Sequence, residues 1–285
     1  MISKALDLFG FEDSRERDKV EMSMGLVDDL RVSPFFPIEK VSHNSKLYRQ
    51  FVANGNRHIR KTSWGELEIR NRLLTQSHLE LFSTIMAHKK SYKQLKSGRI
   101  AIYFSMYEIA QAMGLEWSGR TSDELEERIR QIRDTVIVRR ADKGNGDDYQ
   151  ILQNVDYSKQ YDMWGIVLSD EYSELFRRGL TIGYKHRLGE IRAIKGKGSG
   201  LIKAIIHFFI THDQSKLHRI SLHQLLETIG YPTDARTIST AVTALGKHKE
   251  ELYGFSIAFY RKDRILEYSG TQDIQVIPAL PLTLK

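Results

Sequence analysis

The chain has 285 residues, of which 28% are charged, with a net charge of +7 and no cysteine. This length is enough for two ordinary domains with apolar cores. The absence of cysteine excludes disulfides, thiolate metal sites and cysteine nucleophiles, and it fits a reducing cytoplasm, where we expect the protein to act.

The charge is unevenly distributed. Residues 1–30 carry a net charge of −4, so the rest of the chain carries +11. A basic body with an acidic N-terminal part favours a polyanionic partner, most often nucleic acid. The longest apolar stretch, residues 201–210, contains Lys203 and His207 and is too short to span a membrane, so we expect no membrane partner.

Residues 1–61 are predicted to form an N-terminal arm. Residues 12–21 are densely charged, a composition typical of disorder, so part of the arm is expected to be disordered.

One pattern occurs twice, as FSMYEIAQAMGL at residues 104–115 and as ISLHQLLETIGY at residues 220–231. The second residue of each copy is a serine that can cap a helix, and the second to last is a glycine that can end one: Ser105, Gly114, Ser221 and Gly230. The apolar residues between them follow the spacing i, i+3, i+4, i+7 of one buried helix face: Met106, Ile109, Ala110, Met113, and Leu222, Leu225, Leu226, Ile229.

The flanks of the first copy predict further elements. A long apolar helix is expected over residues 66–88 and a short strand over residues 99–104. A second helix is expected to begin near Thr121, with Thr121 and Glu124 as a capping box and Leu125, Ile129 and Ile132 as its buried face. A hairpin over residues 134–155 is expected to turn at residues 144–146.

The second copy has the same flanks. A helix is predicted over residues 199–212 and a strand over residues 218–220. The next helix is expected to begin near Thr233, and a hairpin over residues 254–270 is expected to turn near Lys262 and Asp263. The predicted buried face of that helix is Ile238, Val242 and Leu245.

Helix, strand, helix, turn, helix and hairpin is the element order of a winged helix-turn-helix. We therefore predict a helix-rich α+β protein with two tandem winged helix-turn-helix domains. The predicted boundaries are residues 62–160 for the first domain, 161–275 for the second and 276–285 for a C-terminal tail.

In such domains the second helix enters the major groove, and basic hairpins contact phosphates. The predicted DNA-binding residues of the second domain are Arg236, Thr237, Ser239, Thr240, Thr243, Lys247, Arg261, Lys262 and Arg264. Those of the first domain are Arg128, Arg130, Arg133, Arg139, Arg140 and Lys143. Because the second helix of the first domain opens with four acids, we expect that domain to contact phosphates or a second subunit, and the second domain to read sequence.

Motifs for catalysis are not found in the sequence. It has no G-x-x-x-x-G-K-[ST] and no G-x-G-x-x-G, and the Gly- and Lys-rich KGKGSG has the wrong spacing for a phosphate loop. No H-x-H or H-E-x-x-H ligand set is present. We therefore expect no enzymatic activity, no cofactor and no metal.

The two paired helix segments, each followed by a helix and a hairpin, resemble in architecture the plasmid replication initiators that bind direct repeats, called iterons, through two tandem winged helices. The resemblance covers about residues 62–270. It implies that the first domain supports dimerisation and phosphate contact, and that the second recognises the iteron through a helix at residues 233–247. It also implies that bound copies recruit host replication proteins.

The segment ALDLF at residues 5–9 is similar to the Q-L-[SD]-L-F peptide by which bacterial replication proteins hold the sliding clamp. The matching residues are Leu6, Asp7, Leu8 and Phe9, whereas Ala5 departs from the usual glutamine. The resemblance implies that Leu8 and Phe9 anchor a mobile arm in an apolar pocket of the clamp.

Two other functions remain open at this point. A winged-helix transcriptional repressor would have the same fold and the same reading helix. An adaptor of a larger complex would use the two domains as scaffolds and would have no salt-dependent affinity for DNA.

Overall fold

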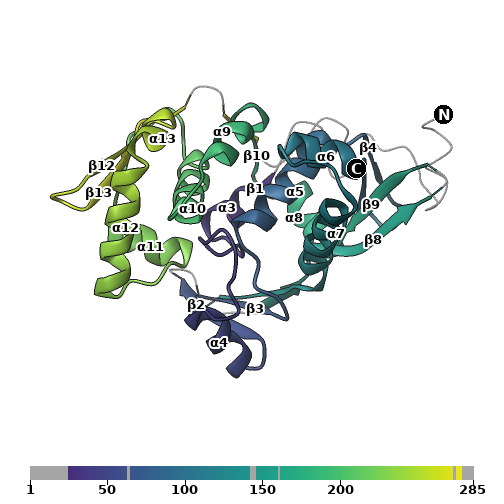
Figure 1. Cartoon of the computed structure of the whole chain (residues 1–285), viewed down its shortest axis with the longest axis horizontal. Coiled ribbons are helices and arrows are strands. Elements are labelled where there is room, and N and C mark those ends of the chain that lie inside the picture. The colour runs from purple at the N-terminus through teal and green to yellow at the C-terminus, as the bar shows by residue number, and fades with distance from the viewer. Residues whose placement is uncertain (1–24, 63–64, 142–145, 160, 272–273, 278–285) are drawn as a thin grey trace, which may run out of the picture.

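The structure, a computed structural model, describes residues 25–62, 65–141, 146–159, 161–271 and 274–277. Within these ranges no helix is both long and apolar enough to cross a membrane. The fold is mixed α+β, with helices and small antiparallel sheets along an elongated molecule (Figure 1).

The elements follow in chain order. The first part of the chain forms β1 (Gly25–Leu26), α3 (Val27–Arg31), α4 (Lys46–Ala53), β2 (Arg57–Thr62) and β3 (Gly65–Arg70). The middle part forms α5 (Gln76–His88), β4 (Ser91–Gln94), β5 (Ile100–Phe104), α6 (Met106–Ala112), α7 (Gly119–Asp134), β6 (Val136–Ala141), β7 (Gly146–Tyr149), β8 (Leu152–Ser158) and β9 (Met163–Leu168). The last part forms α8 (Asp170–Arg178), β10 (Thr181–Gly183), η2 (Lys185–Arg187), α9 (Leu188–Ala193), α10 (Ser199–Ile210), β11 (His218–Ser221), α11 (Leu222–Ile229), α12 (Ala235–Lys247), α13 (Lys249–Gly254), β12 (Ile257–Tyr260), β13 (Ile265–Tyr268) and β14 (Gln275–Ile277).

The sequence repeat corresponds to a structural repeat. In the first unit the strands β5, β9 and β8 are neighbours in that order, and in the second unit the order is β11, β13 and β12. In both, the strand that leads into the paired helices binds the last strand of the hairpin that follows them, as Phe104 pairs with Trp164 and Ser221 pairs with Ile265. The two units therefore share a helix–strand–helix–helix–hairpin arrangement.

The predicted ends and faces of the repeated helices are confirmed. Ser105 Oγ accepts a hydrogen bond from the Glu108 backbone N–H of α6, and Ser221 Oγ accepts one from the Gln224 N–H of α11. The residue Gly230 ends α11 in a left-handed conformation with φ 75°. The predicted apolar faces are buried in both helices.

The predicted helix over residues 66–88 is wrong in its first part. Leu67, Glu68 and Ile69 are all buried, and the segment forms β3 of a sheet with the order β2-β3-β6-β7. The helix α5 begins only at Gln76, where Thr75 and His78 make reciprocal capping hydrogen bonds.

The first predicted hairpin forms, but in a different sheet from β5. Strands β6 and β7 pair with each other, but β6 joins β3 rather than β5. The strand that completes the first unit is β9, which pairs with both β5 and β8. The boundary predicted between residues 160 and 161 therefore falls inside the β8–β9 hairpin, because two hairpins follow α7 instead of one.

The described part of the predicted N-terminal arm is folded onto the rest of the chain. Strand β1 pairs with one side of β10, and β14 pairs with the other. Helix α3 packs against α10. The boundaries predicted at residues 61 and 275 therefore do not separate an arm and a tail from the folded body.

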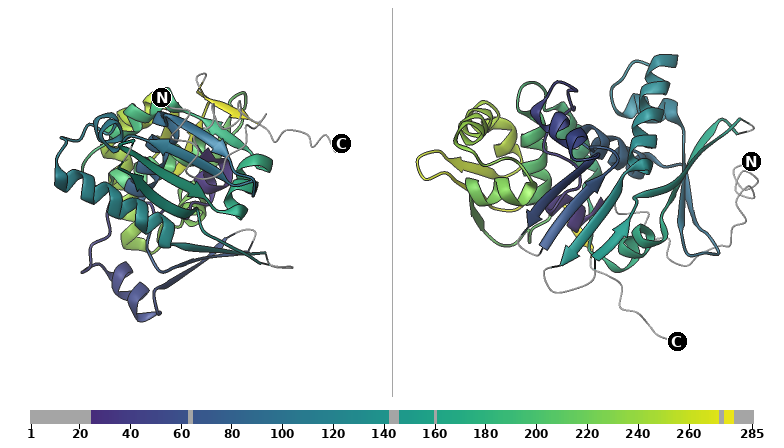
Figure 2. Two further views of the ribbon diagram at one scale, coloured as in Figure 1. Left: turned by 90° about the vertical axis from the view of Figure 1, so that its right-hand side faces the viewer. Right: turned by 90° about the horizontal axis from the view of Figure 1, so that it is seen from below.

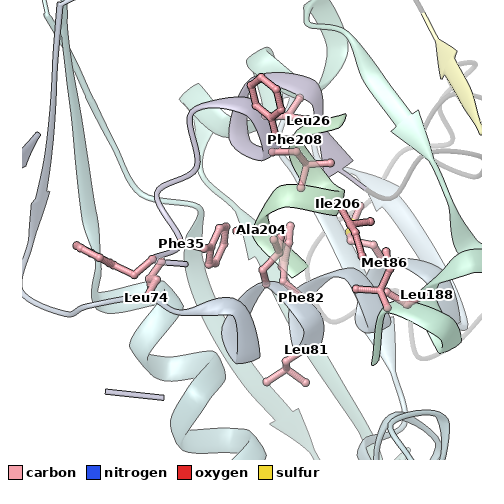
Figure 3. Close-up of a cluster of buried hydrophobic side chains, with 14 of the residues drawn as sticks. Leu26, Phe35, Leu74, Leu81, Phe82, Met86, Leu188, Ala204, Ile206 and Phe208 are labelled. Carbon is pink, nitrogen blue, oxygen red and sulfur yellow. The ribbon is translucent and has the colours of Figure 1, made fainter. Parts of the chain in front are cut away.

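The two units share one apolar core (Figure 3). Phe82 and Met86 of α5 lie near Ala204 and Ile206 of α10, and Leu188 of α9 packs beside them. All five side chains are buried, and the burial of a large apolar side chain contributes about 1.5–3 kcal/mol. Figure 2 shows the same elements from the side and from below. The first helices of the two units are therefore held together.

Candidate nucleic-acid interface

The turn between α11 and α12 fixes where α12 begins. After Gly230, the Tyr231 N–H donates back to the Leu226 carbonyl at 2.8 Å. Asp234 then caps α12, because its side chain accepts from the Thr237 N–H at 3.1 Å. The helix begins at Ala235, two residues after the predicted start.

One face of α12 points to solvent. The exposed side chains are Arg236, Ser239, Thr240, Thr243 and Lys247, all of which were predicted to bind DNA. Thr237 is half-buried, and its hydroxyl donates to Asp234. On the opposite face Leu245 is buried as expected, whereas Ile238 and Val242 are only half-buried against the core. The small Ala241 and Ala244 complete the buried face and let α12 pack closely.

The exposed hydroxyl groups of α12 are oriented by the helix backbone. Thr240 Oγ1 donates to the Arg236 carbonyl at 3.1 Å, and Thr243 Oγ1 donates to the Ser239 carbonyl at 3.0 Å. Because each hydroxyl proton is used within the helix, the oxygen offers only lone pairs to a partner. Such acceptors fit the amino groups of cytosine and adenine in the major groove.

Arg236 complements these acceptors as a donor. Its side chain is exposed in the first turn of α12, and no ion pair joins it to a carboxylate in the part of the chain that the structure describes. An arginine guanidinium can donate two hydrogen bonds to the O6 and N7 atoms of guanine. The face of α12 therefore carries both the donor and the acceptor chemistry of direct base readout.

A basic turn lies beside this helix pair. The predicted hairpin is confirmed as β12 and β13, and the turn between them exposes Arg261, Lys262 and Arg264. Arg264 has a φ of 52°, and its carbonyl accepts from the Leu222 N–H at 2.7 Å. This bond places the turn at the N-terminus of α11, and the three exposed cations of the turn favour contact with phosphate.

Helix α7 of the first unit has a different surface. Leu125, Ile129 and Ile132 are buried as predicted. The helix begins at Gly119 rather than at Thr121, because Ser118 is its cap and accepts from the Thr121 N–H.

The three arginines predicted on α7 all lie near acids of their own segment. Arg128 lies 4.0 Å from Glu124. Arg130 Nε donates to Glu126 at 2.8 Å, and Arg133 Nε donates to Asp134 at 2.9 Å. These acids therefore partly neutralise the positive charge of the three arginines. A hydrogen bond from Arg120 also lowers the pKa of Glu124, so that this acid stays ionised.

Two of the arginines predicted beside the first hairpin turn are engaged within the fold. Arg139 Nη2 donates to Asp29 Oδ1 at 2.7 Å, and Tyr172 donates to the other oxygen of this buried carboxylate at 2.8 Å. Arg140 lies 3.2 Å from the buried Glu68. Arg139 is therefore turned into the body of the protein, which differs from its predicted position on an exposed wing, whereas the Arg140 side chain on the other face of β6 stays 46% exposed.

Other predicted residues lie outside the described ranges. These are Lys143 and the clamp-like residues Leu6, Asp7, Leu8 and Phe9.

Sequence reasoning missed Arg60 on β2. Its guanidinium donates to the Ile229 carbonyl at 3.0 Å and to the Ser33 carbonyl at 2.9 Å, so that it joins β2 to the end of α11. The available signal was the surrounding segment, which contains no aspartate or glutamate between residues 40 and 62.

Comparison with known proteins finds similar solved structures, among them two of RctB. No protein-family profile matches the chain, and no curated protein matches it. A crystal structure of selenomethionine derivatives of domains 2 and 3 of RctB is 10% identical, with a TM-score of 0.49, and the match covers 90% of this chain and 99% of that one. A second crystal structure of RctB domains 2–3 is 12% identical, with a TM-score of 0.42, covering 79% and 91%. At such identities and TM-scores, neither likeness bears on function.

Proposed function

We propose that this protein is a sequence-specific, duplex-DNA-binding initiator of plasmid replication that recognises direct repeats at an origin. The observation that carries the proposal is the exposed face of α12, with its arginine donor and threonine acceptors, next to the basic turn of β12 and β13. This combination supplies base readout and phosphate contact from one unit.

In this proposal each unit is a winged helix. The second unit consists of α10, β11, α11, α12 and the β12–β13 hairpin, with α12 as the reading helix and the turn at residues 261–264 as the wing. The first unit consists of α5, β5, α6, α7 and the β8–β9 hairpin. The shared strand order of the two units supports the assignment.

The two units have different roles in the proposal. The second unit reads the repeat through Arg236, Thr240 and Thr243. The first unit contributes phosphate contacts or contacts to a second copy of the chain, because the acids on α7 disfavour deep entry into a groove of negative potential.

Bound copies then help to open the origin and recruit host replication proteins. No step of this function requires catalysis, a cofactor or a metal, and we place it in the cytoplasm. The clamp-like segment at residues 5–9 is one candidate for the recruiting contact.

A footprint on the DNA that flanks the protein's own gene, made at two salt concentrations, tests the proposal. We expect protection of several evenly spaced direct repeats that survives the higher salt, because base contacts depend less on salt than phosphate contacts do. Protection of a single inverted repeat over a promoter would instead identify a repressor. No protection at either salt would contradict DNA readout.

A further inference from the structure

Residues 40–62, here called the basic bridge, have an unusual charge composition. The segment contains six lysines and arginines, Lys40 included, and no aspartate or glutamate. A run of this length without a single acid is uncommon in a chain of which 28% is charged. The bridge comprises α4, β2 and the loops around them.

Several of these cations have no acid partner. Lys46, Arg49 and Lys61 are exposed, and none is ion-paired with a carboxylate of the described residues. Arg57 is 59% exposed and lies 3.8 Å from Glu68. Uncompensated surface cations attract a polyanion and release counterions when they bind it.

The bridge is nevertheless held firmly in place. Strand β2 pairs with β3 along its whole length, and Phe51 of α4 is buried. His58 packs edge-on against Phe36, with ring centroids 4.7 Å apart. Arg60 ties β2 to the Ile229 carbonyl at the end of α11. The cations are thus presented from a fixed position.

That position lies between the two helix pairs. On one side, a cavity of about 620 Å³ is lined by Lys61 of β2 and by Thr233, just before α12. On the other, a cavity of about 760 Å³ is lined by Tyr48 of α4 and by arginines and acids of α7. Along the long axis of the molecule, α4 lies between α12 and α7 in both Figure 1 and the view from below in Figure 2.

We propose that the basic bridge binds the phosphate backbone of the duplex between the two units, as a contact separate from the reading helix and the wing. This inference rests on the proposed function, because it assumes that α12 engages the same duplex. A segment that exposes several cations and contains no acid of its own fits a polyphosphate backbone, whose charges are spaced regularly along each strand.

The test compares two double variants of the full-length chain. Lys46→Ala/Arg49→Ala removes two exposed cations of the bridge. Arg178→Ala/Lys216→Ala removes two exposed cations elsewhere and changes the net charge equally. Lys216 is remote from the wing because it precedes β11 at His218, which pairs with Tyr268 at the opposite end of β13 from the turn. Affinity for random-sequence duplex is measured over a range of salt concentrations.

We expect the bridge variant to reduce the slope of log affinity against log salt by about 2, roughly one for each phosphate that is no longer neutralised, and the control to leave the slope unchanged. A duplex of one helical turn, about 10 bp, carries only the α12 site. On this duplex the bridge variant and the control should have the same salt slope. Melting temperatures equal to the parent's check that both variants fold.

The outcomes separate this inference from the proposed function. If the bridge variant keeps the parent slope while Arg236→Glu loses specific binding, the function stands and the bridge proposal is overturned. A change in self-association by sedimentation with no change in slope would assign the bridge to a second copy of the chain and also overturn it. If the parent chain binds no duplex, both proposals fail.

Discussion

Lys203 of α10 donates a hydrogen bond to Glu80 of α5 at 3.1 Å across the junction of the two units. The lysine is 1% exposed and also binds Glu39 at 2.9 Å. Arg192 of α9 reaches the second oxygen of Glu80 at 3.1 Å. This network joins the first helices of both units and fixes how one unit is oriented relative to the other.

Removal of one partner of this network should destabilise the folded protein. Lys203→Met leaves two carboxylates with a single cation, and we expect the free energy of unfolding to fall by about 3–5 kcal/mol. Lys203→Met/Glu80→Gln should cost less than the sum of the two single variants. Urea denaturation measures all three. Lys216→Met, which breaks an exposed pair with Asp213, is the control and should cost under about 1 kcal/mol. Additive losses would contradict coupling between Lys203 and Glu80.

The two repeat glycines allow a matched comparison. Gly114 and Gly230 have similar positive φ values of 67° and 75°, so an alanine at either site carries the same backbone strain, about 1–2 kcal/mol. A Cβ at Gly114 meets no atom within 4 Å, whereas one at Gly230 would collide with Arg60. Gly230→Ala should therefore destabilise by about 1–3 kcal/mol more than Gly114→Ala, because Arg60 would lose its carbonyl partners. Equal losses in thermal denaturation would show that the Arg60 contact contributes nothing.

Two buried histidines make stability depend on pH. Burial lowers the pKa of His207 to about 3 and that of His78 to about 4, from the usual 6.5. His78 Nδ1 accepts from the Thr75 N–H at 3.0 Å in the cap of α5, a bond that requires the neutral ring.

Below pH 6.5 the unfolded chain therefore binds protons at these two sites that the folded chain does not bind. The free energy of unfolding should fall by about 1.4 kcal/mol per pH unit for each histidine until the pH reaches its folded pKa. Urea denaturation between pH 5.0 and 7.5 gives the slope of unfolding free energy against pH. The double variant His78→Gln/His207→Gln should remove the contribution of about two protons from this slope. His223→Gln, at an exposed histidine, is the control for the substitution itself. An unchanged slope in the double variant would contradict neutral burial.

Substitution of Arg139 should affect stability, whereas substitution of Arg264 should affect DNA affinity. Arg139→Ala leaves Asp29 buried with only Tyr172 as a partner, so the free energy of unfolding should fall by about 3 kcal/mol or more, with an unchanged salt slope of DNA binding. Arg264→Ala should leave stability nearly unchanged and reduce the slope by about 1. If Arg139→Ala kept the stability of the parent but reduced the salt slope, Arg139 would instead be a DNA-binding residue.

Local patterns predicted the local features of the fold. Ser105, Ser221 and Gly230 act within one helical turn of their own position, so their roles follow from a few neighbouring residues. The buried faces of α6, α7 and α11 likewise follow from helical spacing.

Pairing between distant strands could not be predicted in this way. No local pattern in the sequence indicates that β5 pairs with β9 and that β6 pairs with β3 instead. The inward direction of Arg139 depends on Asp29, 110 residues away, and the position of Arg60 depends on Ile229, 169 residues away. By contrast, the exposed residues of α12 were found because helical spacing alone separates its two faces.

The most direct measurement of the central claim is a ratio of two affinities. One is for a duplex that the parent chain selects from a random pool, and the other is for an unselected duplex. Arg236→Glu should bring this ratio, typically about 10³ or more for specific binders, close to one, because the carboxylate repels the guanine acceptors that an arginine would bind. Arg178→Glu on α8, the control with an equal charge change, should keep the parent ratio. A parent ratio retained by Arg236→Glu, or no sequence selected by the parent chain, would contradict base readout by α12.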